Sequence, residues 1–140
     1  MACSTDGGIG AATEKFGYIW ITMNIGYTWA AQTAAGARNW NGIVLSPDGS
    51  IMVACVNNGY VYVSNDYGVT WLERTGSGIR NWSKITMSPD GVKISACTNG
   101  DYVYTSTDSG ITWFQQNTSG VNAWTGIGAA TDGVNLAIYG

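Results

Sequence analysis

The chain of 140 residues contains no histidine and few charged residues, and both absences narrow its possible chemistry. Without histidine, neither a Ser-His-Asp triad nor a His-ligated metal site can form. Charged residues make up 11% of the sequence, against about a quarter in an average globular protein. Six Lys and Arg residues against nine Asp and Glu give a net charge of −3, which does not suit a nucleic-acid-binding surface. We therefore expect no nucleic-acid partner.

Long hydrophobic runs are also missing. No apolar stretch approaches the ~20 residues of a membrane-spanning helix. The first ten residues combine neither the basic nor the apolar segment of a secretory signal, so we expect no membrane insertion and no signal peptide, and localisation stays unknown. With 20 glycines, seven tryptophans and few Leu, Glu or Lys residues, the composition weighs against long helices and against disorder.

The tryptophans reveal an internal repeat. They stand at positions 20, 29, 40, 71, 82, 113 and 124. A shift of 42 residues carries Trp29 to Trp71 and then to Trp113, and it carries Trp40 to Trp82 and then to Trp124. Trp20 shifts onto Tyr62 and Tyr104 by the same step. A period of this length is typical of repeat architectures.

Each repeat reads as four short strands. In the middle copy, β-branched and aromatic residues predict strands over about 41–46, 51–56, 60–65 and 69–74. Turn residues separate these strands, among them 47–49 (Pro-Asp-Gly) and 57–59 (Asn-Asn-Gly). Four strands in about 40 residues are typical of a β-propeller blade. A β-solenoid is the alternative, although its repeats are usually shorter.

A motif within the repeat resembles a known family. Residues 64–71 and 106–113 both fit Ser-x-Asp-x-Gly-x-Thr-Trp, and residues 22–29 form a degraded copy with Asn24 in place of the Asp. This pattern is similar to the Asp-box, or bacterial neuraminidase repeat, of sialidase-like and sortilin-like β-propellers. The resemblance implies a hairpin between the third and fourth strands of each blade. It assigns structural roles to Asn24, Trp29, Asp66, Gly68, Trp71, Asp108, Gly110 and Trp113.

The box carboxylates are poor candidates for metal ligands or catalytic groups. One carboxylate per turn offers too few hard ligands for Ca²⁺, so we expect no metal and no cofactor. The resemblance to sialidases implies an arginine triad, but Arg38 and Arg80 are equivalent repeat positions that do not converge. The only glutamates, Glu14 and Glu73, show no partner for glycoside hydrolysis. We expect a non-catalytic protein, with sialidase-type hydrolysis as a remote alternative.

One face of the predicted propeller gathers polar and aromatic loop residues. Turns between the second and third strands, and loops from the fourth strand to the next blade, fall on this face. A Trp ring beside amide and guanidinium donors suits a sugar. The candidate ligand-binding residues are Arg38, Asn39, Trp40, Asn57, Asn58, Arg80, Asn81, Trp82, Asn99, Asp101, Asn122 and Trp124. For the three tryptophans, packing between blades is the competing interpretation. For Arg38 and Arg80 it is bracing of neighbouring loops.

Three repeats are too few for a closed ring. The period places blades at about 1–38, 39–80 and 81–122, with half a blade at 123–140. An open arc would expose apolar faces and unpaired strand edges at both ends. We therefore expect a homo-oligomer, in which strands near 124–139 of one chain complete the blade begun by strands near 17–30 of another. A dimer with six blades is favoured and a trimer with nine is possible. The alternative is a fragment of a longer propeller, of natural or engineered origin.

Two hypotheses on function follow. The first is a lectin-like propeller that binds glycans weakly at repeated sites and gains avidity from their number. The second is a structural or protein-docking scaffold without a small-molecule ligand.

Overall fold

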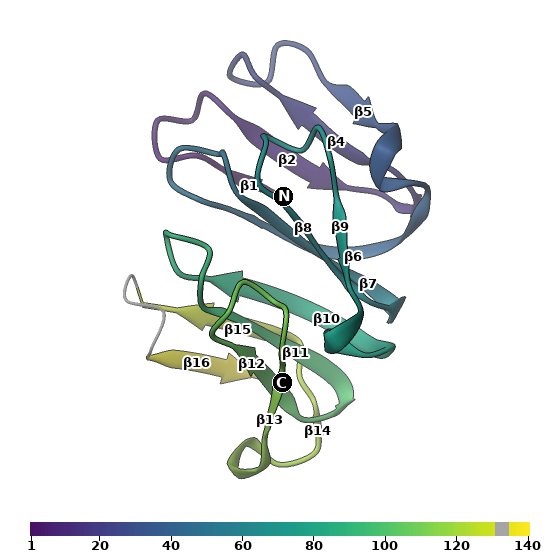
Figure 1. Ribbon diagram of the computed structural model, residues 1–140, viewed down its shortest axis with the longest axis vertical. Helices are drawn as coiled ribbons and strands as arrows, with labels where there is room; N and C mark the ends of the chain where they lie inside the picture. Colours follow the sequence, from purple (N-terminus) through teal and green to yellow (C-terminus); the bar gives the residue numbers. More distant parts are fainter. Residues whose placement is uncertain (131–134) are drawn as a thin grey trace.

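The computed structural model describes residues 1–130 and 135–140 and shows an all-β chain with three short 3₁₀ turns (Figure 1). The strands form antiparallel units that follow one another in chain order, from purple at one end of the long axis to green at the other. Among the described residues, no helix has the length and apolar character needed to cross a membrane.

Three units each contain four strands paired in sequence order. The first consists of β1 (Ala2–Cys3), β2 (Gly10–Thr13), β4 (Ile19–Thr22) and β5 (Ala30–Gln32). The second consists of β6 (Arg38–Leu45), β7 (Met52–Gly59), β8 (Val61–Ser64) and β9 (Leu72–Arg74). The third consists of β10 (Arg80–Met87), β11 (Ile94–Asp101), β12 (Val103–Ser106) and β13 (Phe114–Gln116).

Short strand bridges join each unit to the next. The start of β6 pairs with β3 (Lys15–Gly17), and the start of β10 pairs with the end of β7. β14 (Asn122–Ala123) pairs with the end of β11 in the same way. Each bridge follows a 3₁₀ turn, at Thr33–Ala35, Thr75–Ser77 and Asn117–Ser119. A register shift lies within each bridge, so the chain leaves one unit and enters the next through a bulge.

The C-terminal residues form a separate hairpin of β15 (Gly126–Ala129) and β16 (Leu136–Tyr139). In Figure 1 the hairpin lies beside the green strands of the third unit, and β15 packs on β10 and β11. The first unit, at the opposite end, is completed within the same chain by β1 and β2. The hairpin's connecting turn, which the period equates with residues 47–49, falls outside the described residues.

Three predictions of strands and turns need adjustment. The residues expected to form a turn at 57–59 belong to β7, whose end pairs with the start of β10. The strand expected over 69–74 is limited to Leu72–Arg74, because residues 64–71 are used by the box turn. The strand expected over 41–46 begins earlier, at Arg38, because its start bridges to the preceding unit.

The core lies between the units. Met52, Ala54 and Val56 of β7 join a cluster shared with the first unit, while Val53 and Cys55 join a cluster shared with the third. Alternate side chains of a strand point to opposite faces of its sheet, so both faces of β7 are covered. This explains why all five residues are both apolar and buried.

Candidate binding face

The polar side chains of each Asp-box turn form hydrogen bonds within the same turn. The Ser64 hydroxyl donates to Asp66 Oδ1 at 2.8 Å, and Thr70 donates its backbone N–H to Oδ1 at 2.8 Å and its hydroxyl to Oδ2 at 2.6 Å. Asp108 makes the same three bonds with Ser106 and Thr112. These hydrogen bonds stabilise the charged form and lower the pKa of both carboxyls, to about 2 for Asp108.

The degraded copy of the box forms the same turn. Asn24 Oδ1 accepts the Thr28 backbone N–H at 2.9 Å, and its amide donates to the Thr28 hydroxyl at 2.8 Å. The conserved geometry depends on side-chain oxygen rather than on charge. Asn is therefore an adequate substitute for Asp in this turn.

The tight turns between the first and second strands lie against the boxes. Tyr67 of the second box donates its backbone N–H to Ser50 O at 3.1 Å, and Ser109 of the third donates to Val92 O at 2.9 Å. Asp48 accepts the Ser46 hydroxyl at 2.6 Å and the Ser50 backbone N–H at 3.0 Å, and these bonds lower its pKa to about 2. The carboxylates of this face are thus engaged in holding turns.

The opposite face carries the predicted arginines, which brace loops. The Arg38 guanidinium lies 4.7 Å above the ring of Tyr62, and its Nε donates to Ala35 O at 3.0 Å. Arg80 lies 3.9 Å above the Tyr104 ring and forms an ion pair with Asp101 at 3.4 Å. Each guanidinium is thereby held over a tyrosine of its own unit.

Two of the predicted sugar-stacking tryptophans are buried. Trp40 is 1% exposed and Trp82 is 0% exposed, and each packs edge-on against a tyrosine, Tyr62 or Tyr104. Neither ring presents a face to solvent, so stacking of a sugar on them is corrected to packing between units. Trp124, the third member of the series, is half-buried and donates its Nε1 hydrogen to Gly120 O at 3.4 Å.

The asparagines form a chain across the units. The Asn57 amide donates to Asn81 Oδ1, and the Asn81 amide donates to Asn99 O at 3.2 Å. Asn58 is exposed with a φ of 56°, and Asn122 is exposed and accepts the Ala123 N–H at 2.8 Å. Asn39 Oδ1 is buried and has no partner among the described residues.

A groove of about 430 Å³ opens on the second unit, between the start of β6 and the end of β7. The Arg38, Asn39, Asn57 and Asn58 side chains line it, so the structure brings these four predicted residues together. Tyr60, Tyr62, Glu73 and Ile79 also line it, and the Tyr62 hydroxyl donates to Glu73 Oε2. Burial and this bond raise the pKa of Tyr62 to about 12.

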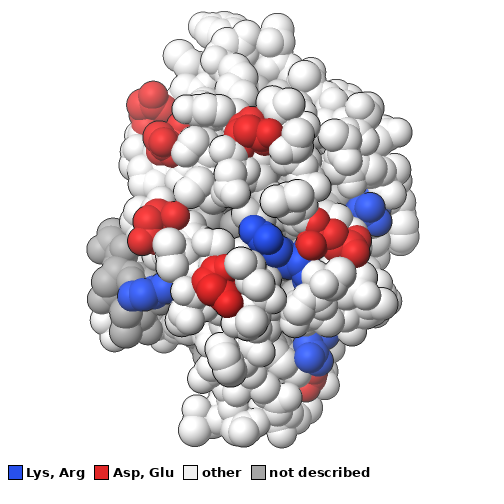
Figure 2. Space-filling model, in the orientation of Figure 1, with Lys and Arg blue, Asp and Glu red and all other residues white. Residues whose placement is uncertain are grey.

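Sequence reasoning missed Tyr60 and Glu73 as lining residues. Tyr60 recurs as Tyr18 and Tyr102, and this repeated tyrosine was the available signal. Glu73 could not be found from the repeat, because its counterparts are Ala31 and Gln115. The groove has one cation and one carboxylate, and the surface in Figure 2 is largely uncharged, with acidic residues in small separate groups. Such a site suits a neutral, hydroxyl-rich ligand better than a polyanion.

Comparison with solved structures identifies the fold. No protein-family model matches the sequence, and a search of curated proteins finds no match. Solved structures do match. A GH74 enzyme of Niastella koreensis superposes with a TM-score of 0.74 over 99% of this chain, at 18% identity. A GH74 xyloglucanase of Xanthomonas campestris gives 0.71 over 94%, at 14% identity, and YCF48 bound to D1 peptide gives 0.68 over 82%, at 18% identity. The fold is a β-propeller.

The propeller chain spans only part of these structures, namely 21% of the first, 25% of the second and 39% of the third. At such identities the likeness shows the propeller fold alone.

Proposed function

We propose that this propeller is a non-catalytic binding module that takes a neutral glycan in the groove on its second unit. The proposal treats each four-stranded unit as a blade of the Asp-box type. The observation that carries it is the convergence of Arg38, Asn57, Asn58, Tyr60 and Glu73 on one groove.

The lining has the chemistry that a sugar requires. Tyr60 is half-buried and offers an aromatic surface to the C–H face of a pyranose. The amides of Asn57 and Asn58 donate to and accept from hydroxyl groups, and Glu73 accepts from them. Because one arginine balances one carboxylate, neither an anionic nor a cationic ligand gains a net advantage.

The third unit holds a related arrangement in which the arginine is paired. The period places Asn99, Gly100, Asp101, Tyr102 and Gln115 where the groove has Asn57, Asn58, Gly59, Tyr60 and Glu73. There the ion pair between Arg80 and Asp101 occupies the guanidinium. We expect weak binding at each of these two sites, with the higher affinity in the groove of the second unit. Avidity should follow when several sites bind one polysaccharide.

The carboxylates support a non-catalytic role. Asp6, Asp48, Asp66, Asp90 and Asp108 all accept hydrogen bonds within turns, and their pKa values are lowered. Glu73 is the one carboxylate among the residues that line the groove. Glycoside hydrolysis by the common mechanisms requires two carboxyl groups about 5–10 Å apart across the bond. Turnover of a fluorogenic sialoside or glucoside would contradict this part of the proposal.

The test is a glycan array followed by titration calorimetry with the best neutral oligosaccharide. We expect Tyr60→Ala to weaken binding about tenfold, equivalent to about 1.4 kcal/mol. Asn58→Gly removes the amide without backbone strain, because Gly100 already stands at that position of the next repeat with φ 90°. Asn65→Ala, at an exposed position of the box face, is the matched control and should bind normally. No binding on the array, or equal affinity of Tyr60→Ala, would reject the groove.

Protein docking is the second candidate, favoured by a row of exposed apolar side chains on the box turns. Tyr27, Val69 and Ile111 occupy one repeat position and are 86%, 64% and 59% exposed. Regular apolar exposure of this kind marks interaction surfaces. Peptides selected on the protein from a display library should lose binding to the Val69→Ser, Ile111→Ser double variant. Unchanged binding would place docking elsewhere.

A further inference from the structure

The C-terminal hairpin has a free strand edge. β7 and β11, the second strands of their units, each pair on both sides. β16 holds the same repeat position and, among the described residues, pairs with β15 alone. Its backbone groups on the other edge are therefore available to another strand.

The hairpin also carries side chains whose counterparts are buried elsewhere. Leu136 and Ile138 stand at the positions of Met52 and Ala54, which are 0% exposed. Leu136 is 36% exposed, and two grooves of about 290 Å³ each lie between these side chains and the third unit. Val103, Thr105 and Gln116 line the other side of these grooves.

The second unit shows what should fill such grooves. Its cluster against the first unit contains Trp40, Met52 and Ala54 from its first two strands, and Tyr62 and Trp71 from its second half. The hairpin supplies the first set as Trp124, Leu136 and Ile138, but not the second. Two aromatic rings are thus the missing part of this junction.

The first unit, at the opposite end, carries the equivalent rings, one half-buried and one exposed. Trp20 and Trp29 hold the positions of Tyr62 and Trp71. Trp71 and Trp113 lie 6.2 and 5.6 Å from a second tryptophan, Trp40 or Trp82. Trp29 has no such partner among the described residues and is 39% exposed.

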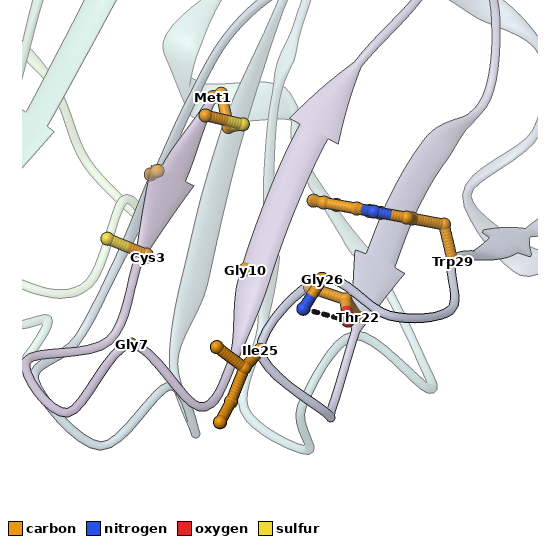
Figure 3. Close-up of a pocket in the computed structure, with 9 residues that line it drawn as sticks. Met1, Cys3, Gly7, Gly10, Thr22, Ile25, Gly26 and Trp29 are labelled. Carbon is orange, nitrogen blue, oxygen red and sulfur yellow. Dashed lines mark hydrogen bonds between the residues drawn. The ribbon is translucent and has the colours of Figure 1, made fainter.

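A pocket marks the side chains missing at that end. Gly10 occupies the position of Met52, Ile94 and Leu136, and an apolar pocket of about 210 Å³ lies between Gly10, Thr22 and Trp29. Figure 3 shows the indole of Trp29 pointing across the strands towards Gly10, with Met1 and Cys3 on the strand at the other side. The rings at this end would fill the grooves beside the hairpin, and the hairpin side chains would fill this pocket. Together they would form the apolar cluster seen in the second unit.

We propose that β15–β16 of one copy and β4–β5 of a second copy form a composite four-stranded unit, in which the hairpin displaces β1 and β2. The register follows from the pairs that β4 already makes. Gly10, Ala11, Ala12 and Thr13 now face Thr22, Ile21, Trp20 and Ile19. In the composite unit Leu136, Ala137, Ile138 and Tyr139 take their places.

The exchange is favoured by residue type. Leu, Ala, Ile and Tyr replace Gly, Ala, Ala and Thr beside β4, which buries more apolar surface and provides better strand formers. The partner must be a second copy, because β4 and the hairpin lie at opposite ends of one chain (Figure 1). Two reciprocal exchanges pair both hairpins and close the assembly, at the cost of releasing β1 and β2 of each copy. This inference is independent of the glycan proposal.

The first test is the mass in solution by light scattering. We expect about twice the 14.8 kDa of one chain, or three times if three copies close the ring. The Leu136→Asp, Ile138→Asp double variant should be monomeric, since both changes charge the composite cluster. Val121→Asp, at a position that is 61% exposed and outside the composite unit, should keep the wild-type mass. A monomeric wild-type chain would overturn the proposal.

The second test identifies the contact. In a Cys3→Ser background, a Thr22→Cys chain is mixed with a Leu136→Cys chain and treated with a short thiol–thiol crosslinker. Mass spectrometry should find the 22–136 crosslink between chains, and a Val121→Cys chain mixed with the Thr22→Cys chain should give none. An oligomer without the 22–136 crosslink would mean that another surface joins the copies, and the composite unit would be wrong.

Discussion

The two fully buried tryptophans of the repeat differ in one hydrogen bond, which makes their relative contribution to stability predictable. Trp40 Nε1 donates to Gly36 O at 3.3 Å, whereas Trp82 Nε1 is buried without an acceptor among the described residues. Their surroundings otherwise correspond. Each ring lies edge-on to a tyrosine, at 5.2 Å for Trp40 and 5.5 Å for Trp82.

Replacing each with Phe removes the same atoms from equivalent sites, so the costs of lost contacts and of the cavity largely cancel in the comparison. Trp40→Phe also loses a neutral hydrogen bond, worth about 0.5–1.5 kcal/mol. Trp82→Phe removes an unpaired buried donor, which relieves about 1–3 kcal/mol. We therefore expect Trp40→Phe to lower the free energy of unfolding by about 2 kcal/mol more than Trp82→Phe.

The assay is guanidinium unfolding followed by far-UV circular dichroism, since the substitutions alter tryptophan fluorescence. All samples need one protein concentration, because association would add to the measured stability. Equal slopes with denaturant would show that the unfolded states are comparable. If Trp82→Phe proved as destabilising as Trp40→Phe, or more so, the assignment of the unpaired donor would be refuted.

Three further predictions concern single residues. Asp108→Asn should retain the turn, as Asn24 does, but change the pH dependence of stability. The native pKa of Asp108 is lowered to about 2, so its carboxylate stabilises the folded protein fully above the unfolded pKa of about 4. This contribution is lost as pH falls towards 2. Acid titrations of the variant should therefore show a smaller loss of stability between about pH 4 and about pH 2. Ile25→Gly should raise the free energy of unfolding by about 1 kcal/mol in thermal or denaturant melts, because Ile25 is exposed and a β-branched residue at positive φ is strained; an unchanged or lowered stability would contradict this. Of the three thiols, iodoacetamide should modify Cys3 alone in the native protein, since Cys55 and Cys97 are fully buried and burial raises the pKa of Cys55 to about 12; intact mass showing two or three adducts without denaturant would contradict the core assignment.

Much of the fold can be predicted from the repeat, because its period aligns residues that have the same structural role in each unit. Gly68 and Gly110 both take positive φ in the box turn, and Ser64 and Ser106 both bond the next carboxylate. Such bonds lie within a few residues of sequence, where the residue types alone are informative. The strand pattern is equally local, which is why a strand over 51–56 is recognisable, although β7 continues through the residues expected to form a turn at 57–59.

The binding face was harder to predict, because it depends on how neighbouring units lie against each other. The period shows that Trp40 and Trp82 are equivalent, but it does not show whether their rings point between the units or towards solvent. Glu73 reaches the groove through its bond to Tyr62, a partner eleven residues away on a neighbouring strand. This pair depends on the register of β8 and β9 within one unit, whereas the burial of Trp40 and Trp82 depends on how neighbouring units pack.

The self-contained bonding of the box turns has a consequence for sequence change. In the second box the holding groups belong to Ser64, Asp66, Gly68 and Thr70, at every other position. The intervening positions 65, 67 and 69 are exposed, and the side chains at 65 and 69 can vary without disturbing the turn, whereas the positive φ at 67 disfavours β-branched residues there. Substitutions on the face that carries the boxes, whether natural or from a designed library, can therefore change its binding specificity without altering the residues of the groove on the opposite face.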